Sequence, residues 1–265
     1  MPPEHDDQLV ATYHQHMLDE HTPANTVKAR LRTLRSVGAP GIATREEIEA
    51  WWRSRNDRSP STRKTDLANL RAFYRWAQRW EHRTDDPTVR LDAPNVPKGL
   101  PRPIARAELL TLLEKLEGDL RRAVCLGAYA GVRVAEAASL DWSDVDVETR
   151  RARVTGKGQK TRKVALSTLL LDNLLPNTGG NVVAAGGKAY STSQLERKVN
   201  RAIKAAGVDA TFHQLRHRYG TLAYQATHDL VAVGEQMGHA SVVTTSIYAA
   251  AADDAADKIA DAVSR

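Results

Sequence analysis

Residues 93–103 read Ala-Pro-Asn-Val-Pro-Lys-Gly-Leu-Pro-Arg-Pro, and this stretch divides the chain. It contains four prolines and one glycine in eleven residues. Proline lacks a backbone N–H and disfavours helix at the residue before it, so a helix cannot run through this stretch. We therefore predict an extended linker over 93–103, one domain over 1–92, a second domain over 104–248 and a short helical tail over 249–265.

The residues before the linker predict an all-helical domain. Apolar side chains recur there at helical spacing, as Leu9 and Tyr13 do. Thr44 with Glu47 three residues later forms a capping box at the start of one helix. A longer helix is predicted to begin at Ser61 or Thr62. Nothing in this part of the sequence alternates as a strand does.

The residues after the linker mix two patterns. Helical runs, one of them over 106–118, come before three strand-like runs at 145–147, 151–155 and 161–166. The glycine-containing segment 156–159 predicts a turn between the second and third strands. Helical runs then return. The sequence thus predicts a mainly α protein of two domains, the second an α+β domain with a small three-stranded antiparallel sheet.

Composition excludes several classes of protein. The single cysteine, Cys125, cannot form an internal disulfide, which excludes a disulfide-stapled secreted fold. The longest apolar run, residues 123–132, is too short to cross a bilayer, and the N-terminus has no signal-peptide pattern. These features predict a soluble cytoplasmic protein without a membrane partner.

The charge indicates a polyanionic partner. The net charge is +6, but residues 93–248 alone hold 21 basic and 14 acidic side chains, a net charge of +7. Within the first domain, basic residues spaced by seven, four and four fall on one stripe of the long helix. Such a stripe is commonly a solvated helix face, whereas against DNA it would contact phosphates. The candidate DNA-binding residues on this stripe and in the linker are Lys64, Arg71, Arg75, Arg79, Lys98 and Arg102.

Two local motifs place cations where a phosphate could bind. Arg133 interrupts an apolar run, and Glu136 three residues later can pair with it. The pair is either a structural ion pair or a device that holds the guanidinium for bidentate contact with a phosphate. Lys157 lies between two glycines at the predicted hairpin turn. It is either a solvated lysine or one that enters a DNA groove or protonates a leaving oxygen.

A third motif is His213-Gln214-Leu215-Arg216-His217. The spacing puts His213 and Arg216 on one helix face, and His217 has a plain interpretation as a surface residue. Two histidines at i and i+4 imitate half of a zinc-protease motif. Gln214 stands where that motif needs a glutamate, and no third ligand is evident, so a phosphate site is favoured over zinc. A fourth motif is Gly238-His239 followed by Tyr248, a tyrosine that by default would pack half-buried.

Taken in order, these motifs resemble the catalytic set of the tyrosine recombinases, the group of the phage integrases and the Xer proteins. The local sequences AGVRVAEAASLDWSDV, TGKGQKTRKVAL, HQLRHRYGT, MGHAS and TSIY carry the resemblance. The six positions are Arg133, Lys157, His213, Arg216, His239 and Tyr248.

The resemblance implies a SAM-like core-binding domain before the linker and a clamp of two domains around duplex DNA. Since the helical part starts almost at residue 8, it also implies a short form without an arm-binding domain. Tyr248 would attack a DNA phosphate, Arg133 and Arg216 would clamp its oxygens, and Lys157 would protonate the leaving oxygen. His239 would donate a further hydrogen bond, His213 would accept the tyrosine proton or assist the clamp, and Glu136 would support Arg133.

The implied partners are duplex DNA sites, a homotetramer on two sites through the tail, and a directionality factor, in a bacterial host. No cofactor and no metal are implied. The resemblance implies integration and excision of a phage or mobile element. The alternatives are a Xer-type dimer resolvase and a DNA-binding regulator that keeps the fold without cleaving.

Overall fold

The computed structural model describes residues 3–97, 102–177, 179–238 and 245–248. The chain forms two compact units, Met1–Lys98 and Gly99–Arg265, so the division falls inside the proline-rich stretch. Three of the predicted features, Lys98, His239 and the tail over 249–265, lie outside the described residues. The two units are described separately below.

Over residues 3–97, the part of the N-terminal unit that the structure describes, the regular elements are all helices. Its Thr44–Glu47 capping box forms as predicted, with Glu47 N–H donating to Thr44 Oγ1 at 3.2 Å and Thr44 N–H donating to Glu47 Oε2 at 2.8 Å. The long helix starts earlier than the predicted Ser61 or Thr62, because Ser59 caps it and the ring of Pro60 is suited to a first helical position. The helices are α1 Pro3–Asp19, α2 Ala24–Val37, α3 Arg45–Arg53 and α4 Pro60–Arg79.

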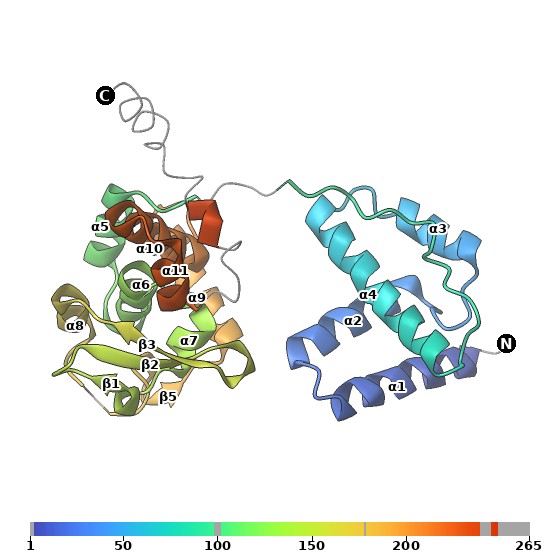
Figure 1. Ribbon diagram of the computed structural model, residues 1–265, viewed down its shortest axis with the longest axis horizontal. Helices are drawn as coiled ribbons and strands as arrows, with labels where there is room; N and C mark the ends of the chain where they lie inside the picture. Colours follow the sequence, from blue (N-terminus) through green and yellow to red (C-terminus); the bar gives the residue numbers. More distant parts are fainter. Residues whose placement is uncertain (1–2, 98–101, 178, 239–244, 249–265) are drawn as a thin grey trace, which may run out of the picture. The chain divides into compact units, whose positions relative to one another are not determined.

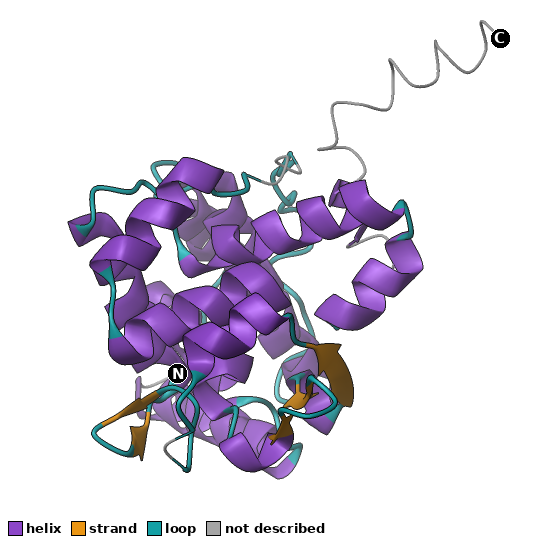
Figure 2. Cartoon of the chain, turned by 90° about the vertical axis from the view of Figure 1, so that its left-hand side faces the viewer, coloured by secondary structure: helices purple, strands orange, loops and turns teal. Residues whose placement is uncertain are grey.

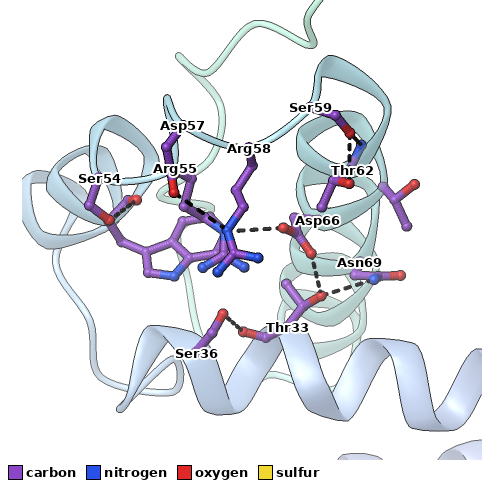
Figure 3. A network of polar contacts seen from close by, with 12 residues as sticks. Thr33, Ser36, Ser54, Arg55, Asp57, Arg58, Ser59, Thr62, Asp66 and Asn69 are labelled. Atoms are coloured by element: carbon purple, nitrogen blue, oxygen red, sulfur yellow. Dashed lines mark hydrogen bonds and ion pairs between the residues drawn. The ribbon is translucent and has the colours of Figure 1, made fainter.

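Helices α1, α2 and α4 lie together in the N-terminal unit (Figure 1). They enclose an aromatic core that includes Tyr13, Phe73 and Tyr74. A buried polar network joins α2 to α4 and to the turn after α3. Asp66 accepts from Thr33 Oγ1 at 2.9 Å and from Arg55 Nε at 3.1 Å (Figure 3). The carboxylate thereby connects three segments of the unit.

The C-terminal unit begins with helices and continues into a small sheet. The predicted helix over 106–118 ends at Lys115, and Gly118 with φ +53° begins the next one. The elements are α5 Arg106–Lys115, α6 Gly118–Ala130, α7 Val134–Ser139, η1 Trp142–Asp144, β1 Val145–Asp146, β2 Arg151–Thr155, η2 Lys157–Gln159, β3 Thr161–Ala165, α8 Thr168–Leu174, β4 Ala184–Ala185, β5 Lys188–Ala189, α9 Thr192–Ala205, α10 Phe212–Thr227 and α11 Leu230–Met237.

The predicted three-stranded antiparallel sheet is confirmed. Its order is β1-β2-β3, with Arg153 opposite Lys163 and Val154 opposite Arg162. Helix α8 and the two-stranded sheet β4–β5 were not predicted, because both are short and carry little local sequence signal. Figure 2 shows that helices form most of the unit and that the strands are few and short. In the described part of the chain, no helix is long and apolar enough to cross a membrane.

The core of this unit centres on α6, which packs against α10. The two helices approach closely at Gly127, where a Cβ atom would stand 3.1 Å from Phe212 and 3.2 Å from Leu215. Gly131 ends α6 in the left-handed conformation, as Gly238 ends α11. Both glycines therefore terminate helices, as their positions in the sequence predict.

Candidate active site

Glu136 is the buried centre of the candidate site. Its side chain is 2% exposed, and its Oε1 accepts from Arg133 Nη1 at 2.9 Å. Its Oε2 accepts from the backbone N–H of Arg133 at 2.8 Å, which caps the first turn of α7. Burial alone would raise the pKa of Glu136, but hydrogen bonds from Arg162 and Arg133 hold that pKa below its ordinary value. The predicted Arg133–Glu136 pair therefore forms, with a carboxylate that stays ionised.

Sequence reasoning missed Arg162, which is the second partner of this carboxylate. Arg162 Nη1 and Nη2 donate to Glu136 Oε1 and Oε2 at 2.8 and 2.9 Å. A signal existed in the sequence, because Arg162 shares its face of β3 with the buried Val164. An arginine at an inward strand position requires a buried acceptor.

Arg216 of α10 is 3% exposed and lies beside this cluster. Its Nη1 donates to the carbonyl of Gly131, and its Nη2 donates to the carbonyl of Met237 at 2.7 Å. Burial and the charge of Arg133 lower the pKa of Arg216 to about 10. The guanidinium is therefore still charged at neutral pH.

The backbone carbonyls at the C-terminal end of α11 accept hydrogen bonds from all three arginines of the site. Arg162, Arg216 and Arg133 donate, in this order, to the carbonyls of residues 236, 237 and 238, at 2.8, 2.7 and 2.6 Å. Carbonyls at the end of a helix lack intrahelical partners and carry the negative end of the helix dipole. The end of α11 thus fixes three cations side by side, and Arg133, with 38% of its side chain exposed, faces solvent.

Tyr248 packs against Gly220 of α10, one helical turn after Arg216. Residues 245–248 are helical, and the tyrosine is 1% exposed in a small core with Val233 and Met237. Burial raises the pKa of the Tyr248 phenol, while the charges of Arg216 and Arg133 counteract the shift. The structure therefore brings the predicted tyrosine and both predicted arginines into one electrostatic neighbourhood.

The two histidines of α10 connect this tyrosine to the surface. The ring of His217 lies 4.2 Å from that of exposed His213 and 5.8 Å from that of Tyr248, measured between ring centroids. The surface interpretation of His217 is wrong, because its ring is half-buried and burial lowers its pKa to about 4. Burial and the charges of Arg216 and Arg133 also lower the pKa of His213.

The side chain of Gln214 has a structural role in the first turn of α10. Gln214 uses its side chain to cap α10, accepting from Thr211 N–H at 2.8 Å. Among the residues that the structure describes, no group of three histidine, cysteine or acidic side chains is placed to hold a metal ion.

Lys157 lies in η2 at the tip of the β2–β3 hairpin, as predicted, with Gly158 in the left-handed region at φ +75°. The hairpin reaches the cluster, since a Cβ atom on the preceding Gly156 would stand 3.2 Å from Glu136 Oε1. His239 falls outside the described residues and directly follows Gly238, whose carbonyl Arg133 holds.

The basic stripe of α4 is only partly free. Lys64, Arg75 and Arg79 are exposed, whereas Arg71 is partly buried and donates to the carbonyl of Leu91. Arg102 of the linker is also exposed. Arg71 thus has a structural contact that the sequence did not predict.

Comparisons with known proteins agree with this architecture. The sequence profile of the phage integrase family matches residues 104–255. Tyrosine recombinase XerC of Corynebacterium glutamicum is 34% identical over 209 residues, which cover 72% of this chain and 68% of that protein. A lambda integrase(75–356) dimer bound to a COC′ core site aligns with a TM-score of 0.75 at 20% identity, over 90% of this chain and 96% of that one. A lambda integrase tetramer bound to a Holliday junction aligns with a TM-score of 0.73 at 19% identity, over 89% of this chain and 77% of that one.

The two lambda structures show only that this chain shares their fold. The family profile and the XerC relative also show to which family the chain belongs. Together they define a site-specific tyrosine recombinase. The chain belongs to the phage integrase family.

Proposed function

We propose that the chain cleaves and rejoins duplex DNA through a covalent 3′-phosphotyrosyl bond on Tyr248. The observation that carries this proposal is the gathering of Tyr248, Arg133 and Arg216 in one cluster of the C-terminal unit. A phosphodiester in transfer spreads negative charge over its non-bridging oxygens. Two guanidiniums held by α11 are proposed to stabilise that charge. Arg133, with 38% of its side chain exposed, meets the phosphate first, and the buried Arg216 joins it when DNA binding moves residues 245–248.

In the proposed step, the Tyr248 oxygen forms a bond to phosphorus and the bond from phosphorus to the 5′ oxygen breaks. The phenol loses a proton, which His213 accepts, and Lys157 supplies a proton to the departing 5′ oxygen. His239 donates a further hydrogen bond to the phosphate. The 5′ hydroxyl of a partner strand then reverses these transfers, so the bond energy is conserved without a cofactor.

The phenol must change its surroundings before it can react. Tyr248 is 1% exposed, and a neutral buried phenol is a weak nucleophile. DNA binding is therefore proposed to move residues 245–248 so that the phenol meets the phosphate beside Arg133.

The experiment uses nicked suicide duplexes made from the genomic DNA that flanks the gene. Cleavage next to the nick releases a short fragment, so the covalent adduct accumulates and is visible as a band of higher mass. The wild-type chain is expected to form the adduct with EDTA present, and Tyr248→Phe is expected to form none. An adduct with Tyr248→Phe overturns the nucleophile assignment, and loss of the wild-type adduct in EDTA overturns the metal-free reaction. DNA binding without any adduct supports the regulator that does not cleave.

The domains and the assembly are part of the same proposal. The helical unit is proposed to bind core-site DNA through the stripe on α4 and the linker residues Lys98 and Arg102. The segment 104–248 carries the chemistry, and the tail over 249–265 docks on a neighbouring subunit in a homotetramer. The lambda integrase tetramer on a Holliday junction supports this assembly as a precedent on the same fold.

The proposed biological role is integration and excision of a phage or mobile element, with a directionality factor that selects between them. A Xer-type dimer resolvase is the second candidate, favoured by the 34% identity to a XerC protein. Deletion of the gene separates the two. Loss of element excision with normal chromosome segregation supports the integrase, whereas accumulation of chromosome dimers supports the resolvase.

A further inference from the structure

Arg162 has the geometry of an anchored side chain. All three of its guanidinium nitrogens donate to protein acceptors, two to the Glu136 carboxylate and Nε to the Gln236 carbonyl at 2.8 Å. Its side chain is 14% exposed, against 38% for Arg133. Arg162 thus has little surface to offer to DNA, while Arg133 keeps a free edge.

We propose that Arg162 is a positioning residue, which sets Arg133 and the end of α11 for contact with the scissile phosphate. The inference rests on the proposed function, because Arg133 is assigned there as a phosphate ligand. It adds Arg162 of β3 to a site to which the β2–β3 hairpin already contributes Lys157.

The first route of this action runs through Glu136. The carboxylate holds Arg133 by a single side-chain hydrogen bond, so the plane of the carboxylate decides where that guanidinium points. The bidentate contact from Arg162 fixes this plane, as parallel N–H···O bonds do. Without Arg162, the buried carboxylate would keep only Arg133 as a charged partner and would turn toward it.

The second route runs through the end of α11. Arg162 holds the Gln236 carbonyl, and its guanidinium lies against Gly238, where a Cβ atom would stand 2.7 Å from Nη1. Arg133 donates to the carbonyl of the same Gly238. Arg162 therefore controls both acceptors of the Arg133 side chain, the carboxylate and the helix end.

The test compares Arg162→Lys and Arg162→Met with a matched control, Arg153→Met. Arg153 lies on the neighbouring strand, is 67% exposed and pairs with Asp144 at the surface. Adduct formation at saturating DNA is expected to slow about 10- to 100-fold in both Arg162 variants, as for residues that orient a ligand group. DNA affinity is expected to stay near that of the wild type, and Arg153→Met is expected to react normally.

A second substrate separates positioning from a general loss of structure. Replacing one non-bridging oxygen of the scissile phosphate by a methyl group removes the charge that Arg133 would stabilise. The defect of Arg162→Lys is expected to shrink on this methylphosphonate duplex, relative to the wild-type chain on the same duplex. A defect of equal size on both duplexes overturns the inference, and so does a wild-type rate for Arg162→Met on the ordinary duplex.

Hydrogen exchange of the DNA-free protein tests the contact of Arg162 with the end of α11 without relying on the reaction with DNA. In both Arg162 variants, the amides at the end of α11 are expected to exchange faster than in Arg153→Met. If the Arg162 variants exchange faster but the wild-type chain forms no adduct, the contact between Arg162 and the end of α11 stands and the proposed function is rejected. A wild-type adduct with unchanged exchange and unchanged rates would reject the role of Arg162 alone.

Discussion

The ring of Tyr248 occupies the space in which a side chain on Gly220 would have to stand. A Cβ atom on Gly220 would lie 2.6 Å from Cε2 of the tyrosine, well inside van der Waals contact. Gly220 belongs to α10, the same helix that carries Arg216 and His217. The absence of one side chain thus lets the proposed nucleophile pack against the helix that holds its proposed partners.

Gly220→Val is expected to displace the tyrosine ring. Overpacking of this kind costs about 1–3 kcal/mol of folding free energy. A displaced nucleophile is expected to lower the rate of adduct formation by about 100-fold, which a suicide-duplex time course measures. Leu222→Val, an equally β-branched change at an exposed position of α10, is the control. Equal rates for the two variants would show that the Gly220–Tyr248 contact does not matter for reaction.

His217 gives the C-terminal unit a pH-dependent stability. Burial, with the charges of His213 and Arg216, lowers its pKa from the ordinary 6.5 to about 4. Above pH 6.5, both the folded and the unfolded chain hold a neutral imidazole. Between pH 6.5 and 4, only the unfolded chain takes up the proton, so the free energy of unfolding falls as the pH falls.

His217→Gln is therefore expected to make this pH dependence shallower. Urea unfolding at several pH values, followed by hydrogen exchange in α10, measures the slope. His14→Gln in α1 is the matched control, because His14 belongs to the other unit. A slope in His217→Gln identical to that of the wild type would contradict the assigned burial.

The architecture was largely predictable, because it depends on local patterns. Each of these patterns acts within a few residues: the proline-rich stretch, the alternation in 151–155 and 161–166, and the helix-ending Gly131. Helix α8 and the β4–β5 ribbon were missed, since they form against a core assembled from distant segments. Tertiary packing decides such short elements, which propensity alone does not.

In the candidate site too, only the contacts between residues close in sequence could be predicted. Arg133 and Glu136 are three residues apart, so their pairing could be predicted. Arg162 reaches Glu136 across 26 residues of sequence, and Arg216 reaches the Met237 carbonyl across 21. Backbone carbonyls carry no sequence signal, so the three-arginine arrangement at the end of α11 becomes visible only in the structure.

Asp66 is expected to hold the N-terminal unit together. Its carboxylate is 3% exposed and binds both Thr33 and Arg55. Asp66→Ala removes the charged partner of Arg55 and one of the two acceptors of Thr33, and it is expected to cost about 3 kcal/mol, measured by urea unfolding of the N-terminal unit. Asp57→Ala is the control, since Asp57 is 75% exposed and lies 3.9 Å from Arg58. A similar loss in both variants would contradict a special role for the buried network.

Arg79 tests the proposed DNA face of α4. If it neutralises one phosphate, Arg79→Ala is expected to reduce the slope of log affinity against log salt by about 0.9, without a change in folding stability. Arg53→Ala is the control, because Arg53 is similarly exposed and lies on α3, away from the stripe. Affinity is measured by fluorescence anisotropy with a short duplex at several salt concentrations. An unchanged slope for Arg79→Ala removes this residue from the DNA face.

The tail is expected to act between subunits rather than on DNA. Its Ile259 and Val263 are four residues apart, so a helix would place both on one apolar stripe, among four acidic side chains in 249–265. Removal of residues 252–265 is expected to leave DNA binding intact, since the acidic segment has no attraction for phosphates. Synapsis and strand exchange are expected to weaken at least about tenfold, because burial of two such side chains contributes more than 1.4 kcal/mol. Ile259→Asp in the full chain is expected to reproduce the loss. Gel-shift assays of the two-site complex measure it, and recombination at the wild-type rate after truncation would refute the docking role.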